Sequence, residues 1–174
     1  VGVEIERQGS PFDAETFDAL FLSSAALWQQ GPCNAPRIVV QGDVQEPSFL
    51  VDGHNRFLWM DIGWPGTPGE IALTKVTRDQ STGEIVDVDM LFNTQDFQFS
   101  LNGEVDPPWL PIAPVLTHEI GHFYGLGHSS APYSIMEAYV EESLPTVPML
   151  SDDDRMGICS LYEKIRSTPT EEDG

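Results

Sequence analysis

Three of the four histidines in this 174-residue chain lie within the segment HEIGHFYGLGH, from His118 to His128. His118 and His122 are four residues apart on a predicted helix, so both rings project from one face, about one turn apart. Two imidazoles in that arrangement can bind one tetrahedral zinc ion. Glu119 lies beside this face, where its carboxylate can reach a metal-bound water as general base without binding the metal.

The glycines that follow determine how a third histidine can reach the same ion. A continued helix would carry the chain past the metal, whereas Gly125 can adopt a positive φ, end the helix and turn the chain back. Gly127 adds freedom, and His128 then arrives from a separate segment. Three protein ligands leave a fourth position for water, as in catalytic zinc sites. HExxH alone also arises by chance, but the longer string predicts one catalytic zinc ion.

Three helices are expected around this segment, over residues 13–30, 112–124 and 151–166. Asp13 and Ser151 are the predicted N-caps of the first and the last helix. Phe17, Phe21 and Trp28 fall on one face of the first helix, as in an amphipathic helix that packs on a core. Residues 168–174 are expected to be a flexible tail.

Five short runs have strand character: 37–41, 55–62, 71–77, 84–93 and 97–101. The third and the fourth flank a turn-forming segment and predict a β-hairpin. In the fourth, Val88 and Met90 point to one side of the strand, and Asp87 and Asp89 point to the other. Strands and helices of this kind in one chain of domain size predict a single α+β (α/β-like) domain.

The charge and the hydropathy of the chain exclude some classes of binding partner. The chain has 28 acidic and 8 basic residues, a formal net charge of -20, and such a surface repels nucleic acid and anionic membranes. Its apolar runs are too short to cross a bilayer, so no membrane insertion is expected. The protein is expected to be a monomer.

The histidine segment resembles the extended zinc motif of the metzincin metallopeptidases. That clan has a methionine in a turn beneath the metal, and Met136 in SIM stands at the matching position. Ser129, directly after the third histidine, is the marker residue of the matrixins, the family of the matrix metalloproteases. Gly121 also fits that family.

The segment LSDDDRMGICSLY, residues 150–162, is similar to the matrixin ending. The resemblance implies that Asp153 and Asp154 tie the last helix to the methionine turn. It also implies a twisted, mostly parallel five-stranded sheet with an antiparallel edge strand and three helices. An active-site cleft would separate an upper subdomain, about 1–127, from a lower one, about 128–167.

The resemblance further implies how a substrate binds. It would lie extended along an edge strand, for which FQFSL, residues 97–101, is the candidate. The pocket for the residue after the cleaved bond would be lined by Pro114, Val115 and Tyr139.

The chain also departs from the matrixin pattern. The segment between Phe92 and His118 is too short for the family's structural zinc and calcium region. His54 is the only histidine outside the motif and is interpreted as a turn residue, so a second histidine-rich zinc site is excluded. A calcium ion elsewhere stays open, although the sequence has no recognisable calcium-binding loop.

Cys33 and Cys159 are either separate thiols or one bridge. Their places after the first helix and in the last favour a disulfide that joins the two, in an oxidising compartment.

The sequence therefore predicts a secreted zinc-dependent endopeptidase in which a zinc-activated water attacks the peptide bond and Glu119 is the general base. Because the chain has the length of a single domain, we expect it to be a secreted microbial member of the family. Its expected partner is a protein or peptide substrate. Two alternatives stay open. One is a zinc-bearing peptide-binding or adhesive module with little turnover, and the other is a zinc hydrolase of small or cell-wall peptides.

Overall fold

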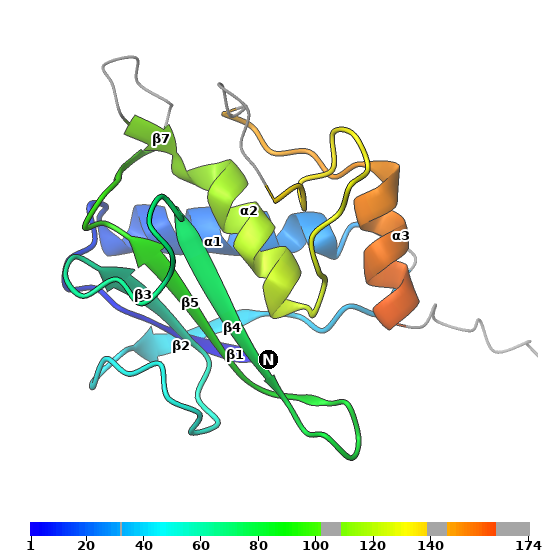
Figure 1. Ribbon diagram of the computed structural model, residues 1–174, viewed down its shortest axis with the longest axis horizontal. Coiled ribbons are helices and arrows are strands. Elements are labelled where there is room, and N and C mark those ends of the chain that lie inside the picture. The colour runs from blue at the N-terminus through cyan, green and yellow to red at the C-terminus, as the bar shows by residue number, and fades with distance from the viewer. Residues whose placement is uncertain (32, 102–108, 139–145, 163–174) are drawn as a thin grey trace, which may run out of the picture.

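The computed structural model describes residues 1–31, 33–101, 109–138 and 146–162. Its main sheet has five strands in the order β2-β1-β3-β5-β4, with helices α1 and α2 packed together on one face (Figure 1). The five strands are β1 (Gly2–Ile5), β2 (Val39–Asp43), β3 (Arg56–Met60), β4 (Ala72–Arg78) and β5 (Ile85–Asn93). All neighbours are parallel except β4 and β5, so the predicted sheet with one antiparallel edge strand is confirmed.

The central part of the sheet contains a strand that the sequence analysis did not predict. β1 pairs with both β2 and β3, and its residues Val3 and Ile5 are completely buried. The prediction that FQFSL is the fifth strand of this sheet was wrong. Its residues Gln98–Ser100 form β6, which pairs with β7 (Trp109–Pro111) in a separate two-stranded parallel sheet. The edge strand next to α2 is therefore β4.

The three helices begin where the sequence predicts. α1 (Ala14–Trp28) is capped by Asp13, whose carboxylate accepts a hydrogen bond from the Thr16 amide at 2.9 Å. α2 (Ile112–Phe123) follows β7 directly. α3 (Asp152–Leu161) is capped by Ser151. It is shorter than the predicted 151–166, because the backbone is already extended at Tyr162. The expected tail lies outside the described residues.

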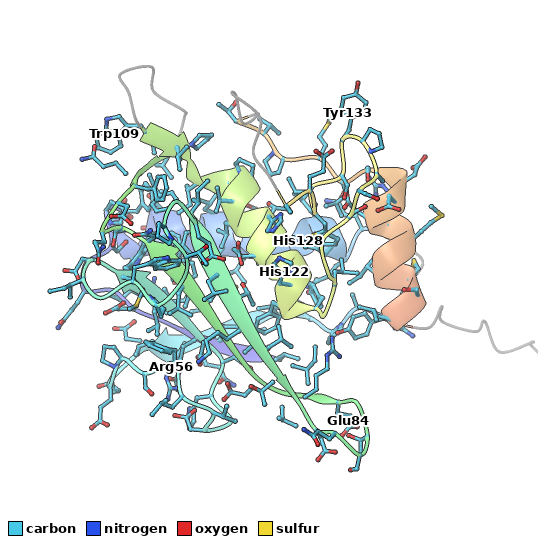
Figure 2. All side chains as sticks on the ribbon, in the orientation of Figure 1. Arg56, Glu84, Trp109, His122, His128 and Tyr133 are labelled. Atoms are coloured by element: carbon cyan, nitrogen blue, oxygen red, sulfur yellow. A yellow bond between two sulfur atoms is a disulfide. The ribbon has the colours of Figure 1, made fainter. Side chains whose placement is uncertain are left out.

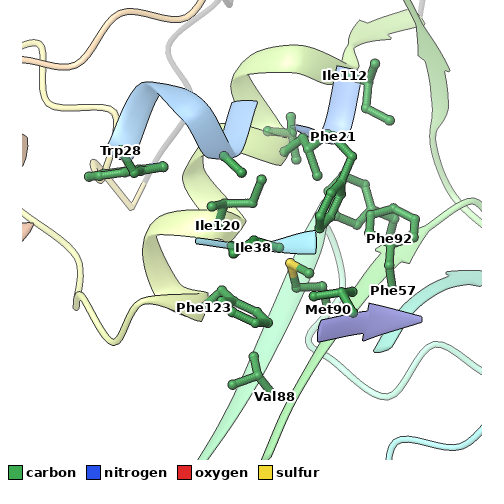
Figure 3. Packing of buried hydrophobic residues seen from close by; sticks show 14 of the residues in the cluster. Phe21, Trp28, Ile38, Phe57, Val88, Met90, Phe92, Ile112, Ile120 and Phe123 are labelled. Atoms are coloured by element: carbon green, nitrogen blue, oxygen red, sulfur yellow. The ribbon is translucent and has the colours of Figure 1, made fainter. Parts of the chain in front are cut away.

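The main core lies between the sheet and helices α1 and α2 (Figure 3). Phe17 and Phe21 of α1 meet Phe57 of β3, with ring centroids 4.8 and 6.3 Å apart. Phe57 also packs on Phe92 of β5 at 4.7 Å. Full burial of a Phe side chain stabilises a fold by about 1.5–3 kcal/mol. These contacts fix α1 on the sheet, and the histidine-bearing helix α2 packs against α1, β4 and β5.

The opposite face of β5 is polar as predicted, but it is also buried. Asp87 and Asp89 are 2% and 0% exposed. The segment after β2 covers them: the amides of Asp52 and Gly53 donate to Asp87 Oδ1 at 3.0 and 2.8 Å. Burial raises the pKa of Asp89 to about 7, and the nearby Asp87 charge adds to the rise. Arg56 acts in the opposite direction and lowers it.

A disulfide joins Cys33, which follows α1, to Cys159 in α3, with Cα atoms 5.2 Å apart. The predicted bridge is confirmed, and it links segments 126 residues apart in sequence. Structural disulfides of this kind form in oxidising surroundings such as the cell exterior. Within the described part of the chain, no helix is long and apolar enough to cross a membrane.

Candidate active site

Helix α2 and the loop after it bring the three predicted ligands together. The ring centroids of His118 and His122 are 4.7 Å apart, and His128 lies 5.3 and 4.8 Å from them. Figure 2 shows His122 on α2 and His128 of the following loop side by side. One nitrogen of each ring falls within 4.8 Å of the others. Among the described residues, this is the only group of three or more potential metal ligands of the His, Cys, Asp or Glu type that lie so close together.

The turn after α2 depends on one of its two glycines. Gly125 has φ +97°, and its amide donates to His122 O at 2.7 Å. A Cβ there would also overlap the Arg78 guanidinium. Gly127 has no positive φ and has open space around it, so this position does not require glycine. Gly125 alone reverses the chain and lets His128 return to the face of α2.

The ring nitrogens away from the cluster are held by backbone carbonyls. His118 Nδ1 lies 2.7 Å from Ile135 O, and His122 Nδ1 lies 2.8 Å from Leu126 O. A carbonyl can only accept, so each Nδ1 carries the proton and each Nε2 keeps its lone pair. Burial lowers the pKa of His118 to about 4 and also lowers that of His122. Both rings are therefore neutral near pH 7, the form that binds metals.

The spacing of the nitrogens also fits a metal. His122 Nε2 and His128 Nε2 are 3.2 Å apart. Two nitrogens on one tetrahedral zinc, each about 2.0–2.1 Å from it, are about 3.4 Å apart. Imidazole is a preferred zinc ligand. The triad can thus hold a zinc ion with little rearrangement.

Met136 packs against the back of α2. It is 2% exposed, and a Cβ at Gly121 would overlap its sulfur and come within 2.8 Å of the Trp28 ring. Gly121 lies between the two helical histidines in sequence, so only glycine allows the methionine turn to approach them so closely. Trp28 Nε1 donates to Thr117 O at 2.9 Å and fixes the same stretch of helix from α1.

The first turn of α3 supports both loops that carry site residues. Ser129 Oγ donates to Asp153 Oδ2 at 2.7 Å. Ser134 Oγ donates to Asp154 Oδ1 at 2.5 Å, and the Ile135 amide donates to its Oδ2 at 3.0 Å. The paired acids therefore connect α3 to the methionine turn and to the residue after the third histidine.

Glu119 is 5% exposed and faces strand β4. Its carboxylate oxygen Oε2 accepts a hydrogen bond of 2.6 Å from Thr74 Oγ1. Burial raises the pKa of Glu119 to about 7, against the lowering effect of the Thr74 hydroxyl. Thr74 was not predicted from the sequence. The one available signal was a polar residue at the same strand parity as Ala72 and Val76, on the side that faces α2.

Two more residues missed from the sequence hold the turn after α2. Arg78, at the end of β4, donates from Nη2 to Gly125 O at 3.1 Å. The Tyr162 hydroxyl donates to Tyr124 O at 2.9 Å. Neither residue stands near the histidine motif in sequence, and both satisfy carbonyls that the end of a helix leaves unpaired.

The remaining predicted site residues have mixed outcomes. Pro114 and Val115 are buried in the first turns of α2, and Tyr139 lies outside the described residues. The substrate pocket therefore stays a prediction. His54 follows Gly53, which has φ +82°, and its exposed ring lies 3.2 Å from Glu4. It is a turn residue as expected, and among the described residues it belongs to no group of potential metal ligands.

A histidine triad of this geometry, backed by a methionine turn and set on a mostly parallel sheet, defines a fold and a candidate metal site of the metzincin type. Comparison with protein families then identifies the family. The matrixin family model matches residues 69–163, which is more than half of the chain. The chain belongs to the matrixin family, whose members depend on zinc.

Three relatives illustrate the similarity. Human matrix metalloproteinase-25 is 30% identical over 165 residues, which cover 93% of this chain and 28% of the human protein. The mouse protein of that name is 39% identical over 69 residues, 38% of this chain and 11% of its own. Rat matrilysin is 46% identical over 50 residues, 29% of this chain and 19% of its own. The chain thus spans well under a third of each relative's length.

Proposed function

We propose that this protein is a secreted zinc-dependent endopeptidase that hydrolyses peptide bonds of extended polypeptides. One observation carries the proposal: three imidazoles converge on one point, and α2, the helix that carries two of them, also carries the buried Glu119 carboxylate. Binding alone needs no general base, so the carboxylate favours hydrolysis over a peptide-binding module. Membership of the matrixin family supports the same reading.

One zinc ion would be held by the Nε2 atoms of His118, His122 and His128. Bound there, zinc would lower the pKa of a water molecule and polarise the carbonyl of the scissile bond. Ile135 O and Leu126 O fix the ring orientations through the two Nδ1 protons. Nothing in the described residues supports a calcium site, and calcium is not part of the proposal.

Glu119 would move the proton. Its Oε2 is occupied by Thr74, and no described residue donates to Oε1, which can accept the proton of the attacking water. The same carboxyl group then delivers the proton to the departing amine. Because Glu119 is buried, its charge is weakly screened by solvent and acts strongly on the reacting groups.

The substrate would lie along β4 as an added strand. β4 is the edge of the main sheet, and it contacts α2, which carries the proposed ligands. Backbone pairing would then give affinity for extended chains of any sequence, with side-chain pockets for preference. A pocket built by Pro114, Val115 and Tyr139 is part of this proposal.

A division of the protein into two subdomains is also part of the proposal. The sheet, α1 and α2 all precede residue 128, which supports an upper subdomain of about 1–127 and a lower one of about 128–167. The disulfide supports secretion. A microbial source and a monomeric state stay predictions.

The test is cleavage of casein by the purified protein, with bound zinc quantified. We expect cleavage that is lost in a metal-stripped sample, restored by zinc, and lost in Glu119→Ala while zinc remains bound. His118→Ala should lose zinc, and its matched control His54→Ala should keep both zinc and activity. Cleavage by Glu119→Ala at the wild-type rate would refute the general-base role. Stoichiometric zinc without cleavage of casein or of short blocked peptides would favour the binding module.

A further inference from the structure

We infer that Thr74 is a positioning residue for peptide hydrolysis: from edge strand β4, its hydroxyl holds the Glu119 carboxylate in its reactive orientation. The inference rests on the proposed function and adds a residue 45 positions away from Glu119 in sequence. Thr74 would act through Glu119 and would touch neither the substrate's reacting atoms nor the metal.

The contact is short and well placed. Thr74 Oγ1 lies 2.6 Å from Glu119 Oε2, the range of charge-assisted hydrogen bonds between a hydroxyl and a carboxylate. The same hydroxyl is 3.4 Å from the backbone oxygen of Glu119. A hydroxyl has one proton, so the shorter contact to the carboxylate takes it. Thr74 is paired with Met90, a core residue of β5, and therefore points to the face of the sheet that α2 covers.

Glu119 needs such a partner because its side chain has three torsions and no other donor among the described residues. An unheld carboxylate would sample several rotamers, and only some place Oε1 toward the histidine cluster. Threonine is suited to hold it, since the branched Cβ restricts its own χ1. A serine would supply the hydroxyl without the same stiffness.

The placement on β4 also couples two parts of the proposed reaction. β4 is the strand along which the substrate would pair, and its residue Thr74 fixes the base. The same strand would therefore position both the substrate and the proton acceptor Glu119. A hydrogen-bond partner for Glu119 on another helix or loop would not link the two positions in this way.

The test compares Thr74→Val, Thr74→Ser and the control Thr77→Val in steady-state peptide hydrolysis. Valine keeps the shape of threonine and removes the hydroxyl. Thr77 lies on the same strand, paired with Asp87 on the opposite face. We expect Thr74→Val to lower kcat about 10- to 100-fold, as for loss of one hydrogen bond to a charged group, with KM and zinc content unchanged. Thr74→Ser should recover most of kcat, and Thr77→Val should match the wild type.

A second measurement reads the contact without activity. Thermal unfolding of the zinc-loaded protein is recorded for Thr74→Val in the wild-type and in the Glu119→Ala backgrounds. If the two side chains interact, the valine substitution lowers the midpoint by about 3 °C or more in the first background and less in the second. Equal shifts in both backgrounds would show no coupling and would overturn the inference.

The outcomes separate this inference from the proposed function. An active wild type with an unchanged kcat in Thr74→Val overturns the inference alone. A loss of kcat accompanied by loss of zinc, or one that serine does not recover, also overturns it, because Thr74 would then be structural. An inactive wild type with bound zinc overturns the proposed function, and the role of Thr74 in it falls as well.

Discussion

Replacement of Asp154 by alanine should both destabilise the protein and weaken its hold on zinc. Asp154 is 2% exposed, and its carboxylate joins the methionine turn to the start of α3. It accepts hydrogen bonds from Ser134 Oγ and the Ile135 amide in the methionine turn. It also accepts from the amide and the hydroxyl of Ser151, the N-cap of α3.

The magnitude follows from the groups that alanine would leave without a partner. The amides of Ile135 and Ser151 would lose their acceptor in a buried site, and each such loss costs about 1–3 kcal/mol. We therefore expect Asp154→Ala to lower the free energy of unfolding by about 3–5 kcal/mol. Ile135 O accepts the Nδ1 proton of His118, so a loosened turn should also weaken zinc binding about 10- to 100-fold.

Urea unfolding of the zinc-loaded protein measures the first effect, and competition with a chromophoric chelator measures the second. Asp152→Ala is the matched control, because Asp152 is an exposed acid in the same helical turn and contributes only through the helix dipole, about 0.3–1 kcal/mol. If Asp154→Ala unfolded within 1 kcal/mol of Asp152→Ala and bound zinc as tightly, the assigned link between α3 and the methionine turn would be wrong.

Three further predictions can be checked by unfolding. Gly125→Ala should cost at least about 1–3 kcal/mol because of its positive φ and the nearby Arg78; a thermal midpoint equal to that of the wild type would contradict this. Cys159→Ser should lower the free energy of unfolding by about 5 kcal/mol in the loop-entropy account. Reducing agent added to this variant measures the effect of the reagent without a disulfide, and a loss of stability no larger than that would refute the prediction. The pKa of Asp89 is raised to about 7 from 3.8, so the folded state keeps a proton that the unfolded chain releases, and this group's contribution to stability falls as pH rises from about 4 to 7. Asp89→Asn should therefore gain stability relative to the wild type between pH 5 and pH 8 in urea titrations, and parallel pH profiles would show that the pKa is not raised.

Local signals in the sequence were sufficient to predict where the helices begin and which histidines are potential metal ligands. The N-caps Asp13 and Ser151 and the start of α2 depend on residues within one turn, so the observed boundaries agree closely with the prediction at all three helix starts. The i, i+4 spacing of His118 and His122 places both rings on one helix face regardless of the rest of the fold. The cysteine count permitted only one intrachain bridge.

Which strands form the main sheet was harder to predict from the sequence, because strand pairing depends on residues that are distant in sequence. β1 has four residues and becomes a strand by pairing with β2 and β3, more than thirty positions away. FQFSL has the alternation of a strand, but nothing within it specifies which strand it joins. Alternation also predicted a polar face on β5, and only the segment around Asp52 and Gly53 decides that this face is buried.

The sequence by itself determined which residues can bind a metal and where the chain must turn to assemble them. Only the tertiary structure decided that Thr74 of β4 holds the Glu119 carboxylate and that Arg78 of β4 holds the turn after α2. The physical reason is that ligand identity and spacing are properties of adjacent residues, whereas burial and hydrogen-bond partners arise when separate segments pack. The environment of Glu119 is therefore a property of the folded protein, although Glu119 itself was evident from the motif.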